Sequence, residues 1–277
     1  MNHVLESVRR AVRSLGVESN NDPQLRRILL AIASPLEAQA VLNAGTPNGN
    51  VSGTFQSGPW KLESFASGFD VVVTGVGKAN AAAGVARVID SSRHCAVISL
   101  GIAGTLPNEE NLNGEVASDA NNSILTYAMD IGDVVVANVM RYADEGLERP
   151  EGFVSLSEMG FPIGPFDEGK GVLAPKELTE VIAELLRKSG CACQVGVIAT
   201  VSTCSGTNAL ARQVVARTGA VAEAMEGAAV CQVAAWFGIS SCEIRVISNT
   251  TGSRSEQRWD VGAAMETLSR IGACLRG

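Results

Sequence analysis

Three polar side chains stand at points where a run of apolar residues ends. Glu37 follows residues 28–33, Glu226 closes a short apolar stretch, and Asn249 follows residues 242–247. If these runs are strands of one α/β sheet, the three side chains lie at the carboxyl ends of strands, where such sheets bind ligands. Carboxylates act as general bases or stabilise positive charge, and an amide both donates and accepts hydrogen bonds. The residue types therefore suit acid–base chemistry on a bound ligand.

The same residues also have a purely structural interpretation. A glutamate in the first turn of a helix is favoured by the helix dipole, and an asparagine after a strand can cap a loop. Small residues after Glu226 let the following helix lie close against a neighbour, and Gly238 ends it. The residue types alone leave both interpretations open.

The elements that must position these side chains alternate between apolar strands and helices. This alternation predicts a three-layer α/β/α sandwich around a central mixed, mainly parallel sheet. A hairpin is expected within residues 43–66, and Asn249 is expected in the loop after its strand. The expected strands are 28–33, 69–74, 95–100, 130–139, 194–201, 220–226 and 242–247, with helices from 36, over 79–91, 175–188, 208–217 and 227–237, and from 261 to about 275.

The domain organisation is expected to be simple. Residues 1–26 form an N-terminal arm, helical or mobile, because apolar residues recur at helical spacing in its first half. Residues 27–277 form a single domain. The polar, turn-rich stretch 107–125 is predicted to be a surface insertion.

Composition and charge exclude several classes of partner. The 277 residues are 46% hydrophobic and carry a net charge of −7 without a basic stripe, so no nucleic acid is expected. No apolar run approaches the roughly 20 residues that span a bilayer, and the first residues lack the apolar core of a secretory signal. We therefore expect a cytoplasmic protein with no membrane partner.

Cysteine and histidine usage argues against a metal site. The seven cysteines are scattered without a CxxC pair, and the two histidines are His3 and His94. This pattern is typical of buried, reduced thiols and disfavours a zinc site or histidine-based catalysis. No cofactor and no metal are expected.

Two short motifs resemble the nucleoside phosphorylase and nucleosidase superfamily. They are EAMEGAAV around Glu226 and RVISNTTG around Asn249. The longer run EIRVISNTTGSRSEQRWDV is most similar to futalosine hydrolases, which remove hypoxanthine from futalosine in an alternative menaquinone pathway. The resemblance follows the chain from Ile28 to about Leu275. It implies the phosphorylase/hydrolase-like architecture, a purine nucleoside substrate, and a homodimer or higher homo-oligomer.

The resemblance also implies a role for each candidate residue. Met225 and Glu226 hold the ribose, and Glu226 favours the cationic sugar formed as the bond breaks. Asn249 holds the purine, and Glu37 orients and deprotonates water. The base-contacting loop is assigned to Ser205, Gly206 and Thr207.

Two loops decide between phosphate and water as the nucleophile. In the phosphorylase branch each matching loop carries an arginine that grips phosphate, whereas these loops read SLGIAGT and ASPLEAQ. An anion without a cationic partner binds poorly, so water is the expected nucleophile with Glu37 as its base. Around Ile102, Ala103 and Gly104, small side chains let backbone amides approach a ligand.

The asparagine and the segment after it bear on the substrate. Adenine-cleaving relatives use an aspartate where this chain has Asn249, and an amide can direct its NH₂ group to O6 and N7 of a 6-oxopurine. Trp259 with Arg254 or Arg258 offers an apolar wall and a hydrogen-bond donor for the 5′ benzoate of futalosine. Equally, the arginines are solvated and Trp259 anchors the last helix. The source of the leaving-group proton is not explained by these residues.

Three alternatives stay open. A purine nucleoside phosphorylase would use phosphate, and a methylthioadenosine or inosine nucleosidase would take another nucleoside. A non-catalytic nucleoside-binding protein would have the same fold, but such a protein is expected to have lost Glu37 or Glu226, and both are present.

Overall fold

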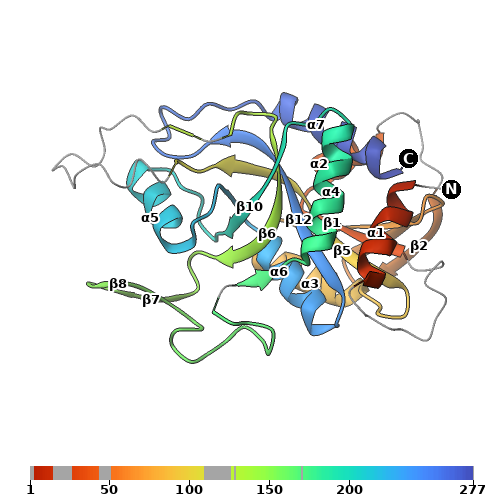
Figure 1. Ribbon diagram of the computed structural model, residues 1–277, viewed down its shortest axis with the longest axis horizontal. Helices are drawn as coiled ribbons and strands as arrows, with labels where there is room; N and C mark the ends of the chain where they lie inside the picture. The colour runs from red at the N-terminus through yellow and green to blue at the C-terminus, as the bar shows by residue number, and fades with distance from the viewer. Residues whose placement is uncertain are drawn as a thin grey trace.

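The computed structural model of the chain describes residues 3–14, 27–43, 51–108, 126–127, 129–169 and 171–276 (Figure 1). The strands are β1 (Arg27–Ile32), β2 (Val51–Ser57), β3 (Trp60–Phe65), β4 (Phe69–Val73), β5 (His94–Thr105), β6 (Val134–Tyr142), β7 (Gly146–Arg149), β8 (Gly152–Ser155), β9 (Val172–Leu173), β10 (Cys193–Thr200), β11 (Ala222–Ala224) and β12 (Ser240–Thr250). The helices are α1 (His3–Ser14), α2 (Pro35–Asn43), α3 (Lys78–Val88), α4 (Lys176–Lys188), α5 (Asn208–Thr218), α6 (Gly227–Trp236) and α7 (Val261–Arg276).

One mixed sheet runs through the described residues, in the order β11-β10-β6-β12-β5-β1-β4-β3-β2. β1, β4, β5 and β12 pair in parallel, as do β6, β10 and β11, whereas β12 meets β6 in antiparallel orientation. β11 also pairs antiparallel with β5. Five strands (β5, β12, β6, β10 and β11) therefore close into a ring, which the sequence did not predict.

Helices cover both faces of the sheet, which confirms the expected three-layer architecture. Apolar side chains of α1, α2, α4 and α7 pack against one face, and those of α3 and α6 against the other. α5 packs at the end of the ring, beside the segment that follows β10. In Figure 1, α1 and α4 lie side by side in front of the sheet, and the β7–β8 hairpin projects from the body. Among the described residues, no helix is both long and apolar enough to cross a bilayer.

Helix boundaries follow local chemistry. The side chain of Thr207 caps α5 by accepting from the Leu210 N–H at 3.2 Å. Gly219, with φ of 63°, ends the same helix in the left-handed conformation that glycine adopts without strain. Ser34 precedes α2, and Pro35 occupies its first turn, where a missing N–H costs nothing.

Two of the differences from the sequence prediction concern β5 and β12, the strands beside Asn249. β5 continues to Thr105 and β12 to Thr250, because the two strands keep pairing beyond the predicted ends. Asn249 therefore lies inside β12 and not in a loop, which corrects that expectation. A register shift between Ile247 and Asn249 lets the strand bend there. The expected insertion over 107–125 lies, from residue 109 onward, outside the described residues.

A buried ion cluster anchors the amino-terminal end of the sheet. Asp70 in β4 is fully buried and accepts from Arg27 Nε at 2.6 Å and Arg93 Nε at 2.6 Å. His94 Nδ1 accepts from the Asp90 N–H, so its Nε2 is the donor to Asp70 at 3.0 Å. Burial alone would raise the pKa of Asp70, but these hydrogen bonds outweigh it and hold the pKa well below its usual range.

We expect Asp70→Asn to lower the free energy of unfolding by about 3 kcal/mol, because one partner of a buried pair is removed while Arg93 is partly exposed. Urea denaturation measures this. Because the folded-state pKa of Asp70 is lowered, its stabilisation is present at neutral pH and is lost as the pH falls below the ordinary aspartate range, about pH 4. Glu184→Gln, which breaks an exposed pair with Lys188, is the control and should leave stability nearly unchanged. Equal losses in both variants would contradict the assignment.

Candidate active site

Glu37 is held at the carboxyl end of β5 by hydrogen bonds to both of its oxygens. Its Oε2 accepts from the Ser34 N–H at 3.0 Å and the Ser34 Oγ at 2.7 Å, in the reciprocal pattern of a capping box. Its Oε1 accepts from the Ile102 N–H at 2.9 Å. The strand-to-helix turn therefore fixes this carboxylate, which is 5% exposed, against Ile102 in the carboxyl-terminal part of β5.

Glu226 is placed by the junction between β11 and α6. It precedes the first residue of α6 and makes no side-chain cap of its own helix. Its Oε1 instead accepts from the Gly77 N–H at 3.0 Å, in the turn between β4 and α3. Gly77 has φ of 92°, a conformation that other residues rarely adopt. Because the Glu226 carboxylate makes no hydrogen bond to its own helix, it is available to interact with other groups.

A buried guanidinium joins the two sides of the site. Arg245 in β12 is 2% exposed, and its Nη2 lies 3.1 Å from Glu226 Oε2. Its Nε donates to Glu243 Oε1 at 2.7 Å. Its Nη1 donates to the Ile102 carbonyl at 3.3 Å and its Nη2 to Ser99 Oγ at 3.2 Å. All three guanidinium nitrogens are therefore engaged.

The opposite charges of Arg245 and its acidic neighbours, here called the charge cluster, stabilise one another. The acids are Glu243, Glu226 and Glu37. Burial lowers the pKa of Arg245, but the nearby Glu243, Glu226 and Glu37 raise it by more, so the arginine stays charged. Burial raises the pKa of Glu243, and Arg245 opposes that rise. Sequence reasoning did not assign Glu243 or Arg245. The available signal was a pair of charges two residues apart, on one face of an otherwise apolar strand.

Two glycines make room for the charge cluster because they have no side chain. A Cβ on Gly101 would lie 2.5 Å from Arg245 Nη1 and 2.6 Å from Glu37 Oε1. A Cβ on Gly227 would lie 1.8 Å from Glu243 Oε2. Both distances are far below van der Waals contact. The absence of a side chain at these positions is therefore a condition for the cluster to form.

Asn249 lies at the end of β12, 8% exposed, with its amide orientation fixed by neighbours. Its Oδ1 accepts from Ser248 Oγ at 2.8 Å, and its Nδ2 donates to the Thr250 carbonyl at 3.0 Å. A Cβ on Gly104 would lie 3.0 Å from Asn249 Nδ2, so the NH₂ group lies over this glycine of β5. Ala103 is buried beside it, and its carbonyl accepts from Ser248 Oγ at 3.2 Å.

The loop over Ser205 and Gly206 is tied to the segment that follows Asn249. The Gly252 N–H donates to the Ser205 carbonyl at 3.3 Å, and the Arg254 N–H donates to the Gly206 carbonyl at 3.1 Å. Thr207 is committed to capping α5. The loop and the segment after Asn249 therefore form one side of the site.

Trp259 is not an anchor of the last helix. It is 50% exposed and bridges to Asn249 in antiparallel pairing. Its Nε1 donates to Gln257 Oε1 at 3.0 Å, and the Arg254 guanidinium lies 4.8 Å from its ring centre. The structure thus brings Arg254, Trp259 and Asn249 together. Met225 is half-buried beside the cluster that includes α5.

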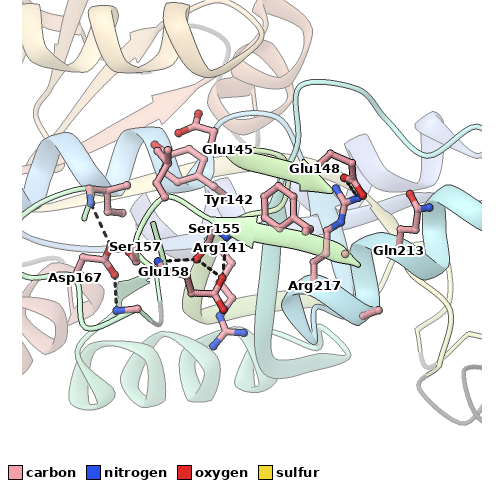
Figure 2. A pocket seen from close by; sticks show the side chains of 17 residues that line it. Arg141, Tyr142, Glu145, Glu148, Ser155, Ser157, Glu158, Asp167, Gln213 and Arg217 are labelled. Atoms are coloured by element: carbon pink, nitrogen blue, oxygen red, sulfur yellow. Dashed lines mark hydrogen bonds and ion pairs between the residues drawn. The ribbon is translucent and has the colours of Figure 1, made fainter. Parts of the chain in front are cut away.

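A separate cavity of about 600 Å³ lies between the β7–β8 hairpin and α5 (Figure 2). Arg217 lines it, 2.5 Å from Glu148 and with its guanidinium 4.5 Å from the centre of the Phe153 ring. Tyr142 and Glu145 lie on its wall. None of the predicted site residues lines this cavity, so it is distinct from the candidate active site.

The family of the chain follows from comparison with known proteins. The family model described as Phosphorylase superfamily matches residues 27–275. This chain belongs to the phosphorylase superfamily. A futalosine hydrolase of Acidothermus cellulolyticus is 35% identical over 74% of this chain and 74% of its own length. One of Streptomyces coelicolor is 31% identical over 87% of this chain and 92% of its own length. These relatives confirm the expectation that the protein belongs, within this superfamily, with the futalosine hydrolases.

Solved structures of superfamily members share the fold. The native futalosine hydrolase of Helicobacter pylori aligns with a TM-score of 0.67 at 18% identity, covering 92% of this chain and 98% of that chain. A 5′-methylthioadenosine/S-adenosylhomocysteine nucleosidase of Neisseria meningitidis aligns with a TM-score of 0.68 at 19% identity, covering 91% and 98%. Each similarity extends over nearly the whole chain.

We expect Gly101→Ala to lower the turnover number by about 10²-fold, because the new methyl group must displace Glu37 or Arg245, and a shift of about 1 Å in a catalytic group has this effect. Steady-state hydrolysis by folded protein, with folding checked by circular dichroism, is the measurement. Gly53→Ala is the control: it lies in β2, away from the site, and its Cβ would meet its nearest neighbour at an ordinary 3.9 Å. Unchanged turnover in Gly101→Ala would show that the cluster tolerates displacement and plays no catalytic part.

Proposed function

We propose that this protein hydrolyses the N-glycosidic bond of futalosine, releasing hypoxanthine and dehypoxanthine futalosine in the futalosine route of menaquinone biosynthesis. One observation carries the proposal. Two buried carboxylates, Glu37 and Glu226, flank a single buried guanidinium at the carboxyl end of the sheet, in a chain whose curated relatives at 31–35% identity are futalosine hydrolases.

The charge balance of the cluster favours departure of the base. As the glycosidic bond breaks, positive charge develops on the ribosyl group. Glu226 binds the ribose hydroxyls and stabilises this charge, while Met225 packs against the ribose. Glu37, aimed by Ser34 and the Ile102 N–H, accepts a proton from the attacking water. Asn249 binds the departing purine.

The arrangement of charges around Arg245 also disfavours phosphate as the nucleophile. Arg245 pairs with Glu226 and feels the charge of Glu37, and its nitrogens are already engaged by Glu243, Glu226 and backbone or serine oxygens. A phosphate placed there would meet Glu37 and Glu226 without a free cationic partner. Water carries no charge and meets no such repulsion.

Other properties follow from the proposal. The substrate is a small purine nucleoside, and the protein forms a homodimer or higher homo-oligomer with no nucleic-acid or membrane partner. None of the seven cysteines forms a disulfide, which supports the expected reducing, cytoplasmic location.

The proposal predicts that hypoxanthine release from futalosine is independent of phosphate. Purified protein is assayed with and without inorganic phosphate, and the products are separated by chromatography. Glu37→Gln should lower turnover by about 10²-fold or more, the usual effect of losing a positioned base. Glu158→Gln is the control, because Glu158 makes the same pair of hydrogen bonds to a serine but on an exposed surface. Formation of ribose 1-phosphate derivatives would identify a phosphorylase instead.

Trp259 and Arg254 predict how the 5′ group is bound. The exposed indole with a guanidinium over its ring offers an apolar wall and a donor for a benzoate. Trp259→Ala should raise the Michaelis constant for futalosine by about tenfold more than that for inosine, which lacks the 5′ group. Equal changes for the two nucleosides would assign Trp259 to the base site or to folding.

A further inference from the structure

Glu243 in β12 is a fully buried acid to which the proposed mechanism gives no role. Its Oε1 accepts from Arg245 Nε at 2.7 Å. Its Oε2 lies against Gly227, the first residue of α6, and has no hydrogen-bond partner among the residues that the structure describes. Arg245 therefore supplies both the hydrogen bond and the positive charge that hold Glu243 in place.

Arg245 is shared between two carboxylates. Its Nη2 lies 3.1 Å from Glu226 Oε2, whereas its Nε donates to Glu243. Glu226 comes from the β11–α6 junction and Glu243 from β12, so the two acids reach the guanidinium from different segments. A guanidinium spreads a single positive charge over all of its nitrogens. Neither carboxylate therefore receives the whole of that charge.

Charges near this pair act with little screening, because the neighbouring side chains are buried. Cys231 of α6 is fully buried, and burial raises the pKa of its thiol to about 12, with the charge of Glu243 adding to the rise. This thiol is therefore neutral at pH 7 and supplies no charge of its own. Ser99, which pairs with Glu243 in the sheet register, is also buried. In such surroundings one charge acts on another more strongly than it does in water.

The proposed reaction depends on the negative charge of Glu226. The ribose of the bound nucleoside is uncharged, but the ribosyl group becomes positive as the glycosidic bond breaks. A guanidinium paired with Glu226 alone would cancel much of the negative charge that stabilises this cation. A second carboxylate on the same guanidinium offsets that loss, because it keeps an excess of negative charge in the charge cluster.

We propose that Glu243 is a positioning residue for the reaction. It holds Arg245 and compensates its positive charge, so that Arg245 orients Glu226 without reducing the negative charge that Glu226 presents to the ribosyl cation. This inference rests on the proposed function and gives a role to a carboxylate that is buried behind Arg245. The effect is specific for the transition state, because only there does the sugar carry positive charge.

The first test separates the charge of Glu243 from its shape. Glu243→Gln keeps the size of the side chain and an oxygen that accepts from Arg245, but it removes the charge. Glu243→Asp keeps the charge and is shorter by one methylene group. In steady-state hydrolysis of futalosine, kcat should fall by about 10- to 100-fold in the glutamine variant and by less than about threefold in the aspartate variant. KM should stay within about twofold in both, as expected for a contribution made only in the transition state.

A purely structural role predicts the opposite order, because the shorter aspartate leaves a cavity and the glutamine does not. Circular dichroism and urea denaturation check that each variant is folded. Glu158→Gln, which removes an exposed carboxylate, is the control and should keep both constants. Unchanged kcat in Glu243→Gln would overturn the inference. A fall of about tenfold or more in Glu243→Asp would also overturn it, even if the glutamine variant does not fold.

A second measurement needs no turnover. Isothermal titration calorimetry compares iminoribitol, whose ring nitrogen is protonated at neutral pH, with anhydroribitol, whose ring oxygen is uncharged. Wild-type protein should bind iminoribitol at least about tenfold more tightly, and this preference should fall by about tenfold in Glu243→Gln and persist in Glu243→Asp. An equal preference in wild type and Glu243→Gln would overturn the inference even if futalosine is cleaved. The expected pattern in a protein that does not hydrolyse futalosine would support the role of Glu243 and refute the proposed function, so the two failures are distinguishable.

Discussion

The buried charge of Arg245 is the constraint on which the rest of the site depends. A guanidinium removed from water costs several kcal/mol unless its hydrogen bonds and its charge are both satisfied. Here the satisfaction comes from β12 itself through Glu243, from the β11–α6 junction through Glu226, and from β5 through the Ile102 carbonyl. Three segments far apart in the sequence must therefore meet at one point. Because Arg245 contacts Glu226 and Glu243, fixing its position also fixes theirs.

β12 directs polar side chains to both faces of the sheet, and the register shift within the strand makes this possible. Arg245 pairs with Gly101 and Asn249 with Gly104, so residues 245–249 of β12 oppose residues 101–104 of β5, one residue fewer. In a regular strand residues four apart share a face, and the extra residue at the shift moves Asn249 to the other one. The strand thus presents its charged pair beneath α6 and its amide on the opposite side. One local irregularity therefore separates the Glu243–Arg245 pair from Asn249.

The features that sequence reasoning could predict are those with local signals. Glu37 and Glu226 were found because each ends an apolar run and begins a helix. Arg245 was missed because an arginine inside an apolar strand gives no sign of its partners, which are fixed by strand pairing over long distances. The extension of β12 past Asn249 was missed for a similar reason, since polar residues there are stabilised by pairing with β5.

The closed ring was also beyond prediction, because β11 has only three residues and its pairing with β5 leaves no periodic pattern. That pairing has a consequence for how the protein is made. The Thr105 hydroxyl donates to the Val221 carbonyl across 116 positions of sequence. Closing so long a loop carries an entropic cost before any contact compensates it, and folds rich in such contacts form slowly. A nascent chain holds Glu37 early, yet it lacks Arg245 and the ring until β12 has left the ribosome. Until then the edges of β5 and β6 that pair with β12 are unpaired, so synthesis passes through a stage at which binding by a chaperone would protect the chain from aggregation.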